Sequence, residues 1–129
     1  MFMRLAQYRP QFLSLMRIAF AITFIEHGTQ KLQSFPTPAP AMLPLPLLYF
    51  TGILETFGGT AIALGLYTRL FAFLVSGEMA VGYWTMHVPR SFFPMANGGE
   101  VMVLYCFAFL YIAAAGPGPW SLDARMGRT

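Results

Sequence analysis

The sequence predicts an all-α integral membrane protein built as a four-helix bundle. Of its 129 residues, 57% are hydrophobic and only 10% are charged, and the mean hydropathy is +0.58. A soluble domain carries about 25% charged residues, so this chain lacks the charges that a water-facing surface needs. A spanning helix takes about 20 residues, so four spans, their connectors and two tails fit one domain over residues 1–129.

Four apolar segments are the predicted membrane spans. They cover residues 13–32, 47–66, 70–88 and 98–115. The prolines between residues 33 and 46 cannot continue a helix, so they form the longest connector. The turn at residues 65–69 is short, which makes the second and third spans antiparallel neighbours. A Gly-Pro-Gly-Pro run at residues 116–119 ends the fourth span.

The basic residues predict the orientation. Four spans place both termini on one side, which would hold Arg4, Arg9, Arg69, Arg125 and Arg128, whereas the opposite loops hold only Lys31 and Arg90. The excess of arginine on the terminal side indicates cytoplasmic termini. Because the basic residues are scattered singly, the sequence excludes a basic nucleic-acid-binding patch despite a net charge of +3.

Glutamates fall within all four predicted spans. They are Glu26, Glu55, Glu78 and Glu100. An ionised carboxylate near the bilayer centre costs about 2.5–3.5 kcal/mol, so such a residue faces the bundle and finds a partner or a proton. Helical spacing places Glu55 on one face with Gly52 and Gly59, a face that packs against protein. Glu55 and Glu78 are therefore predicted to be the catalytic, proton-handling residues.

A polar pocket is predicted toward the outer side, opening outward under the proline-rich connector. Its predicted binding residues are Arg17, Glu26, His27, Lys31, His87, Asn97 and Glu100. His27 and Lys31 could donate hydrogen bonds to a quinone carbonyl or a small oxyanion, and Arg17 would compensate charge. Imidazole and carboxylate groups also suit Zn²⁺, Fe or Mn, but no Glu-x-x-His or His-x-x-x-His motif occurs, so no metal site is predicted.

Structural roles are the alternative for several of these residues. Arg17 could form an ion pair with Glu55 or Glu78 inside the bundle. Asn97 and Glu100 have the spacing of a helix-capping box, with Asn in place of Ser or Thr. The single cysteine, Cys106, excludes an intrachain disulfide and a C-x-x-C redox pair.

The chain resembles the DoxX family of small four-helix bacterial membrane proteins over roughly residues 12–124. The resemblance is carried, in order, by His27-Gly28-Thr29-Gln30-Lys31-Leu32, Glu55 with Gly58-Gly59, Gly65-Leu66-Tyr67-Thr68-Arg69, His87-Val88-Pro89, Phe93-Pro94 with Asn97-Gly98-Gly99-Glu100, and Gly116-Pro117-Gly118-Pro119-Trp120-Ser121-Leu122-Asp123. It implies a multi-pass protein of the bacterial inner membrane. Arg17, Glu26 and Glu78 are proposed from burial alone.

The resemblance also implies a function. The name-giving relatives look like small subunits of thiosulfate:quinone oxidoreductases, or membrane partners of thiol and superoxide-defence enzymes. Because this sequence has no cysteine pair, haem motif or nucleotide-binding loop, electrons would have to be carried by a partner or a bound quinone. We therefore expect a subunit of a membrane redox complex, surrounded by lipid, bound to a protein partner and able to form a homodimer.

Two other functional classes stay open. The chain could be a non-catalytic binding or assembly protein that docks a partner through its proline-rich connector. It could also be a small transporter, although four spans leave little room for alternating access unless the protein dimerises.

Overall fold

The structure is a computed structural model that describes residues 1–129, and its regular structure is entirely helical. The all-α class is therefore confirmed. The elements are α1 (Phe2–Ala6), α2 (Arg9–Gln33), α3 (Leu45–Ile53), the π-helical segment η1 (Leu54–Gly58), α4 (Gly59–Leu64), α5 (Thr68–Gly82), the π-helical segment η2 (Tyr83–His87), α6 (Pro94–Asn97), α7 (Glu100–Ala115) and α8 (Leu122–Arg125).

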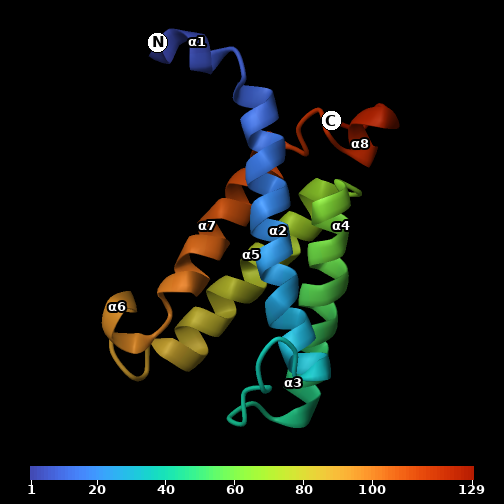
Figure 1. Ribbon diagram of the computed structural model, residues 1–129. Helices are drawn as coiled ribbons and strands as arrows, with labels where there is room; N and C mark the ends of the chain where they lie inside the picture. The colour runs from blue at the N-terminus through green and yellow to red at the C-terminus, as the bar shows by residue number, and fades with distance from the viewer.

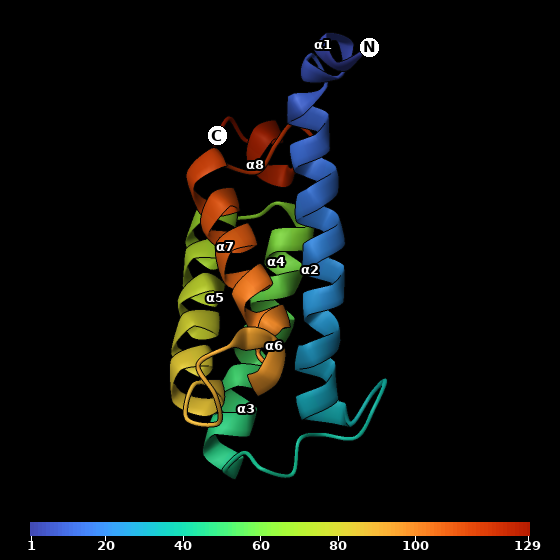
Figure 2. The same cartoon turned by 90° about the vertical axis from the view of Figure 1, so that its left-hand side faces the viewer.

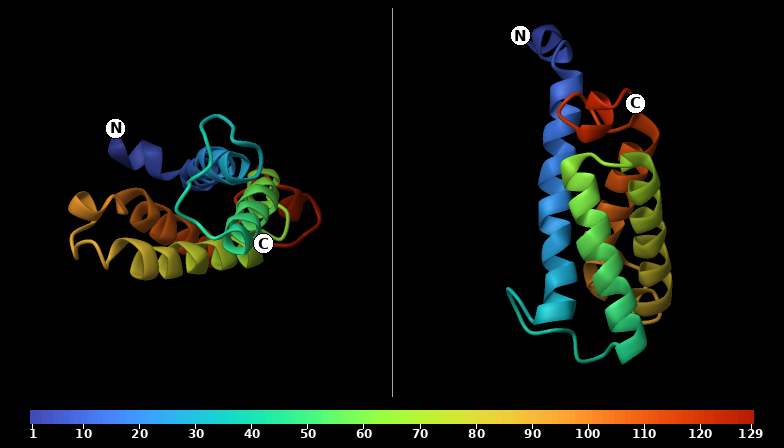
Figure 3. Two further views of the ribbon diagram at one scale, coloured as in Figure 1. Left: turned by 90° about the horizontal axis from the view of Figure 1, so that it is seen from below. Right: turned by 90° about the vertical axis from the view of Figure 1, so that its right-hand side faces the viewer.

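Four long helical segments lie side by side, and both chain termini are at the same end (Figures 1 and 2). The segments are α2, the continuous run α3–η1–α4, the run α5–η2, and α7. Their bounds lie within a few residues of the four predicted spans. α2 packs along α3–η1–α4, and α5 packs along α7, whereas α2 and α7 touch each other much less (Figure 3).

The four helical segments differ in hydropathy and in length. Leu45–Leu64 is the one helical run that is both long and apolar enough to cross a membrane, and Glu100–Ala115 is a shorter apolar helix. A run of 20 residues spans about 30 Å, which matches the hydrocarbon core of a bilayer. The remaining two segments contain charged residues that lower their hydropathy, including Arg17 in α2 and Glu78 in α5.

Aromatic rings join the two helix pairs at the centre. Phe24 of α2 is fully buried and contacts Tyr105 and Phe109 of α7, with ring centroids 5.3 Å and 4.9 Å away. These rings belong to one buried cluster, with Ala21, Ile62, Ala72, Val75, Met79 and Ile112. The cluster provides the hydrophobic core that the apolar faces of all four segments share.

Glycines bring α2 and α3–η1–α4 close together. A Cβ atom at Gly28 would lie 2.6 Å from the backbone nitrogen of Thr56 and 3.0 Å from the carbonyl oxygen of Gly52. A Cβ atom at Gly52 would lie 3.0 Å from the Cβ of Lys31. Small residues of this kind allow helices in a membrane protein to approach closely. The same approach places Lys31 opposite η1.

The C-terminal segment is held by Arg17, which is fully buried. The Arg17 guanidinium donates hydrogen bonds to the carbonyl oxygens of Ile62, Ala63, Pro117 and Trp120. The predicted ion pair of Arg17 with Glu55 or Glu78 is therefore wrong. Arg17 lies in the half of α2 nearer the termini, where the end of α4 and the loop after α7 present carbonyl groups. The Ile62 carbonyl also accepts from the Gly65 N–H, whereas those of Ala63, Pro117 and Trp120 accept from no backbone N–H.

The turn from α4 to α5 is also fixed by the C-terminal segment. Tyr67 has a left-handed backbone, with φ of 47°, and the start of α5 has no local side-chain cap. The buried carboxylate of Asp123 instead accepts hydrogen bonds from the backbone N–H groups of Tyr67 and Thr68, at 2.9 Å and 2.8 Å. Asp123 therefore caps α5 from a distant part of the sequence.

We predict that Gly28→Ala separates α2 from η1. The added methyl group meets backbone atoms that cannot rotate away, so the substitution should cost about 1–3 kcal/mol of stability. Thermal unfolding in detergent, followed by circular dichroism, measures this cost. Gly77→Ala is the matched control, because nothing lies within 4 Å of a Cβ atom there and alanine favours the helix. Equal effects of the two substitutions would contradict the close contact.

We predict that Arg17→Met costs about 3–5 kcal/mol, because it leaves buried carbonyl groups without donors. Arg17→Lys should restore only part of this stability, since lysine lacks the planar set of donors. The measurements are thermal unfolding and the rate of proteolysis within residues 116–129. Arg69→Met is the control, because Arg69 is exposed although it also donates to carbonyls, those of Ala113 and Ala114. A similar loss in both variants would contradict the role of Arg17.

The Asp123 contacts predict a pH dependence of stability. Burial pushes the pKa of Asp123 upward, but hydrogen bonds from Thr68 and Tyr67 and the charge of Arg128 bring the net pKa below its ordinary value. A carboxylate with a lowered pKa in the folded state stabilises the fold above its unfolded pKa of about 4, and this contribution disappears as the pH falls through the folded value. Asp123→Asn should therefore be less stable than the parent protein at pH 7, and the gap should narrow below pH 4. Melting temperatures measured from pH 3 to pH 7 test this, and a constant gap would contradict it.

Candidate functional site

The interior contains an ion pair between Lys31 and Glu55. The Nζ atom of Lys31 lies 2.7 Å from Oε1 of Glu55, and only 11% and 2% of the two side chains are exposed. Lys31 comes from the last turn of α2. Glu55 lies in the π-helical segment η1, and such single turns within α-helices occur frequently at functional sites. The sequence analysis assigned Lys31 to ligand binding and Glu55 to proton handling. In the structure the two side chains bind each other.

Glu78 of α5 is the third member of this site. Both of its carboxylate oxygens are buried without a hydrogen-bond partner in the protein, and so is Oε2 of Glu55. Glu78 lies on α5, which contacts the η1 segment that carries Glu55. We refer to Lys31, Glu55 and Glu78 as the buried charge centre. Three helical segments therefore supply one charged side chain each.

The buried charge centre is not electrically balanced. Two carboxylates face one ammonium group, which leaves one negative charge in excess when all three are ionised. An unpaired buried carboxylate is costly, so it takes a proton or a hydrogen bond from a ligand. The excess negative charge favours a proton or a neutral ligand over an oxyanion.

His27 and Glu26 lie outside this centre. Both side chains are exposed on α2. The ring of His27 packs edge-on against Tyr105 of α7, with centroids 5.7 Å apart. Arg17 is also outside, since it holds the C-terminal segment.

The remaining predicted residues organise the connector before α7. Asn97 is buried, donates to Tyr83 Oη at 3.1 Å and to the Ser91 carbonyl at 2.9 Å, and accepts from the Gly99 N–H at 2.8 Å. His87 Nδ1 lies 3.0 Å from the Asn97 carbonyl oxygen. The predicted capping box is wrong: Gly99 is the N-cap of α7, and no side chain caps that helix. The Asn97 side chain forms a local turn in the connector through the Gly99 N–H, and the Glu100 side chain is exposed.

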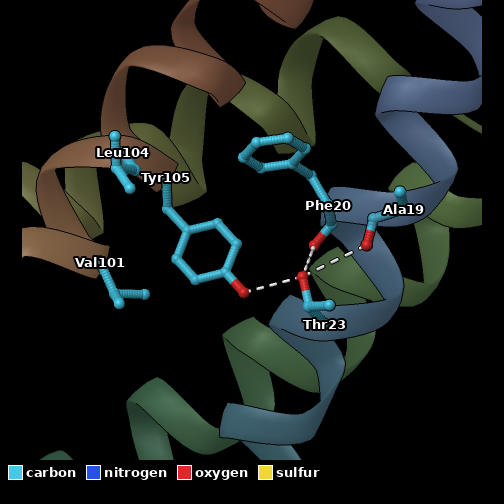
Figure 4. Close-up of a pocket in the computed structure, with 6 residues that line it drawn as sticks. All are labelled: Ala19, Phe20, Thr23, Val101, Leu104 and Tyr105. Carbon is cyan, nitrogen blue, oxygen red and sulfur yellow. Dashed lines mark hydrogen bonds between the residues drawn. The ribbon is translucent and has the colours of Figure 1, made fainter.

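A groove between α2 and α7 is a feature that the sequence analysis missed (Figure 4). Its volume is about 280 Å³, and its lining residues are Ala19, Phe20, Thr23, Val101, Leu104 and Tyr105. Tyr105 Oη donates a hydrogen bond of 2.8 Å to Thr23 Oγ1, and Tyr105 belongs to the same buried cluster as Met79, the residue after Glu78 in α5. The apolar spacing of these residues is the same as that of a helix core, so the sequence carried no distinct signal for a groove.

A second cavity, of about 470 Å³, lies at the end that carries the termini. The end of α4, the loop after α7 and α8 form its walls. Neither cavity is lined by the proline-rich connector, so the outward-opening pocket stays a prediction. No group of three or more His, Cys, Asp or Glu side chains is placed to hold a metal ion.

Comparisons with known proteins identify the family. The sequence model described as DoxX matches residues 12–88. An uncharacterized protein of Haemophilus influenzae is 43% identical over 127 residues, which cover 94% of this chain and 95% of the relative. The inner membrane protein YphA of Escherichia coli K12 is 33% identical over 129 residues, which cover 91% of each chain. No solved structure matches the chain.

These matches span most of the chain and include the segments that supply Lys31, Glu55 and Glu78. The chain is therefore a membrane protein that belongs to the DoxX family.

Proposed function

We propose that this protein is a small subunit of an inner-membrane redox complex, in which the buried charge centre exchanges a proton with a quinone-like ligand. The observation that carries the proposal is Glu78, whose buried carboxylate has no hydrogen-bond partner beside the Lys31–Glu55 ion pair. The name of the relative YphA, an inner membrane protein, supports the location.

The proposed membrane placement is a multi-pass four-helix bundle with cytoplasmic termini. Its support is the position of the charged residues: Arg17, Lys31, Glu55 and Glu78 point into the protein, so the polar helices can span despite their low hydropathy. Large apolar side chains cover the outer faces instead, among them Phe57, Phe73, Val81, Leu104 and Phe107. The excess of arginine at the terminal end supports the orientation.

The proposed chemistry divides the work between this chain and a companion. A quinone takes up two electrons and two protons when it becomes a quinol, and this chain contains no electron carrier of its own. A companion subunit supplies the two electrons, Glu78 supplies one proton to a carbonyl oxygen, and water supplies the second proton and reprotonates Glu78. Lys31 stays paired with Glu55, and its ammonium group offsets part of the negative charge that develops when Glu78 loses its proton.

The groove between α2 and α7 supports access from the lipid. Its lining is mostly apolar, as a quinone tail requires, and its polar edge is formed by Tyr105 and Thr23. Because Tyr105 and Met79, the neighbour of Glu78 in the sequence, belong to one buried cluster, we place the ligand head at this edge of the groove. A ligand that enters from the bilayer needs no opening to water.

An assembly function is the second candidate. The connectors at the end opposite the termini expose large apolar side chains, including Phe35, Met42, Phe92, Phe93 and Met95. A companion protein that covered these side chains would be held without any chemistry in the buried charge centre.

We predict that Glu55→Gln and Glu78→Gln weaken the binding of a short-chain ubiquinone by about tenfold or more, since the first breaks the ion pair with Lys31 and the second removes the carboxyl group that donates to the ligand. The measurement is quinone titration of the protein purified gently from its membrane, with native mass spectrometry to detect companion chains. Infrared difference spectra should contain a protonated-carboxyl band that Glu78→Gln removes. Glu100→Gln is the matched control, because Glu100 is exposed and lies outside the centre.

Two results would contradict the redox proposal. One is unchanged quinone binding in both variants while circular dichroism shows that they are folded. The other is a protein without quinone that stays bound to one specific companion, which would support the assembly function.

A further inference from the structure

The second cavity combines apolar walls with a free cationic group. Leu64, Trp120 and Leu122 line it and are 53%, 52% and 36% exposed. Arg125, also in the lining, is exposed, and its guanidinium donates no hydrogen bond to the protein and lies in no ion pair. An arginine next to a tryptophan is typical of the level where lipid headgroups meet the hydrocarbon core.

Three other arginines at this end are already engaged, whereas Arg4 and Arg9 are exposed near the N-terminus and do not line the cavity. Arg17 and Arg69 donate to backbone carbonyls, and the guanidinium of Arg128 lies 4.6 Å from the ring centre of Tyr67. The carboxylate at this end, Asp123, is bound by backbone N–H groups. Arg125 is therefore the cation of the cavity that is free to bind an anion.

The cavity wall is held in place from inside. The Trp120 carbonyl accepts a hydrogen bond from Arg17, and the Trp120 N–H donates to Ser14 Oγ at 3.1 Å. Ser121 Oγ donates to the Gly118 carbonyl and accepts from the Ala124 N–H. The loop after α7 thus presents the cavity on a fixed backbone, so a ligand would bind a preformed site.

We propose that this cavity binds an anionic phospholipid, with its phosphate on Arg125 and an acyl chain along Leu64, Trp120 and Leu122. Charge complementarity selects an anionic head, and the apolar walls select a lipid over free phosphate. Basic pockets at the cytoplasmic side of helical membrane proteins recognise anionic headgroups in this way. The inference uses the membrane placement proposed above and is independent of the redox chemistry.

Trp120 gives a direct test, because the chain contains two tryptophans and Trp84→Phe leaves Trp120 as the single emitter. The full chain with this substitution is placed in phosphatidylcholine nanodiscs that contain increasing amounts of phosphatidylglycerol with brominated acyl chains. We expect Trp120 fluorescence to be quenched by brominated phosphatidylglycerol at a lower mole fraction than by brominated phosphatidylcholine. Arg125→Gln should raise the required mole fraction about fivefold, the effect of one arginine near an anionic surface.

Arg90→Gln is the matched control, because Arg90 is an exposed arginine in the connector before α6 and does not line the cavity. It should leave the quenching unchanged, and circular dichroism checks that both variants are folded. Equal quenching by the two brominated lipids, or no change with Arg125→Gln, would overturn the proposal. Millimolar inorganic phosphate should not release the lipid, and full release by phosphate would show that the site selects phosphate without the acyl chain. A failure here would leave the ubiquinone titration of Glu78→Gln unaffected, so the two proposals can fail separately.

Discussion

The close packing of α2 on α3–η1–α4 is the constraint on which the candidate site depends. Gly28 and Gly52 have no side chain at the contact, so the two backbones approach until Lys31 lies opposite η1. The ammonium group then reaches Glu55 inside the protein, where water cannot screen the pair. A wider separation of these helices would leave an unpaired ammonium and an unpaired carboxylate in an apolar interior, which is costly on both sides.

Arg17 and Glu78 are two buried ionisable residues whose surroundings differ. The hydrogen bonds from Arg17 are accepted by four backbone carbonyls, three of which have no backbone partner, so both sides of the contact are satisfied. Glu78 has no such arrangement: both oxygens are buried and neither has a partner in the protein. The fold gives Arg17 four acceptors but gives neither oxygen of Glu78 a partner. This difference supports the proposal that Glu78 stays free to exchange a proton.

The sequence predicted the parts of this fold that depend on local patterns. Apolar runs and clusters of proline and glycine gave the four segments, because helix formation is governed by residues close in the chain. The partners of Arg17 could not be predicted, since Pro117 lies 100 residues away and offers a backbone carbonyl that every residue possesses. Asn97 was equally ambiguous, because the same spacing fits a capping box and a connector turn. The inward direction of Glu55 followed from helical periodicity, but its π-helical turn and its pairing with Lys31 required the packed structure.

The limited contact between α2 and α7 leaves an apolar groove between these helices. α2 packs closely on α3–η1–α4 and α5 packs closely on α7, whereas here Tyr105 and Thr23 form a hydrogen bond at the edge of the groove, which supports the proposed access from lipid. A ligand that replaced Thr23 as the partner of Tyr105 could enter without disturbing the Gly28 contact or the carbonyl contacts of Arg17, which lie on other faces of α2. The faces of α2 that fix the charges and the face that lines the groove are thus separate, so the proposed access from lipid need not weaken the fold.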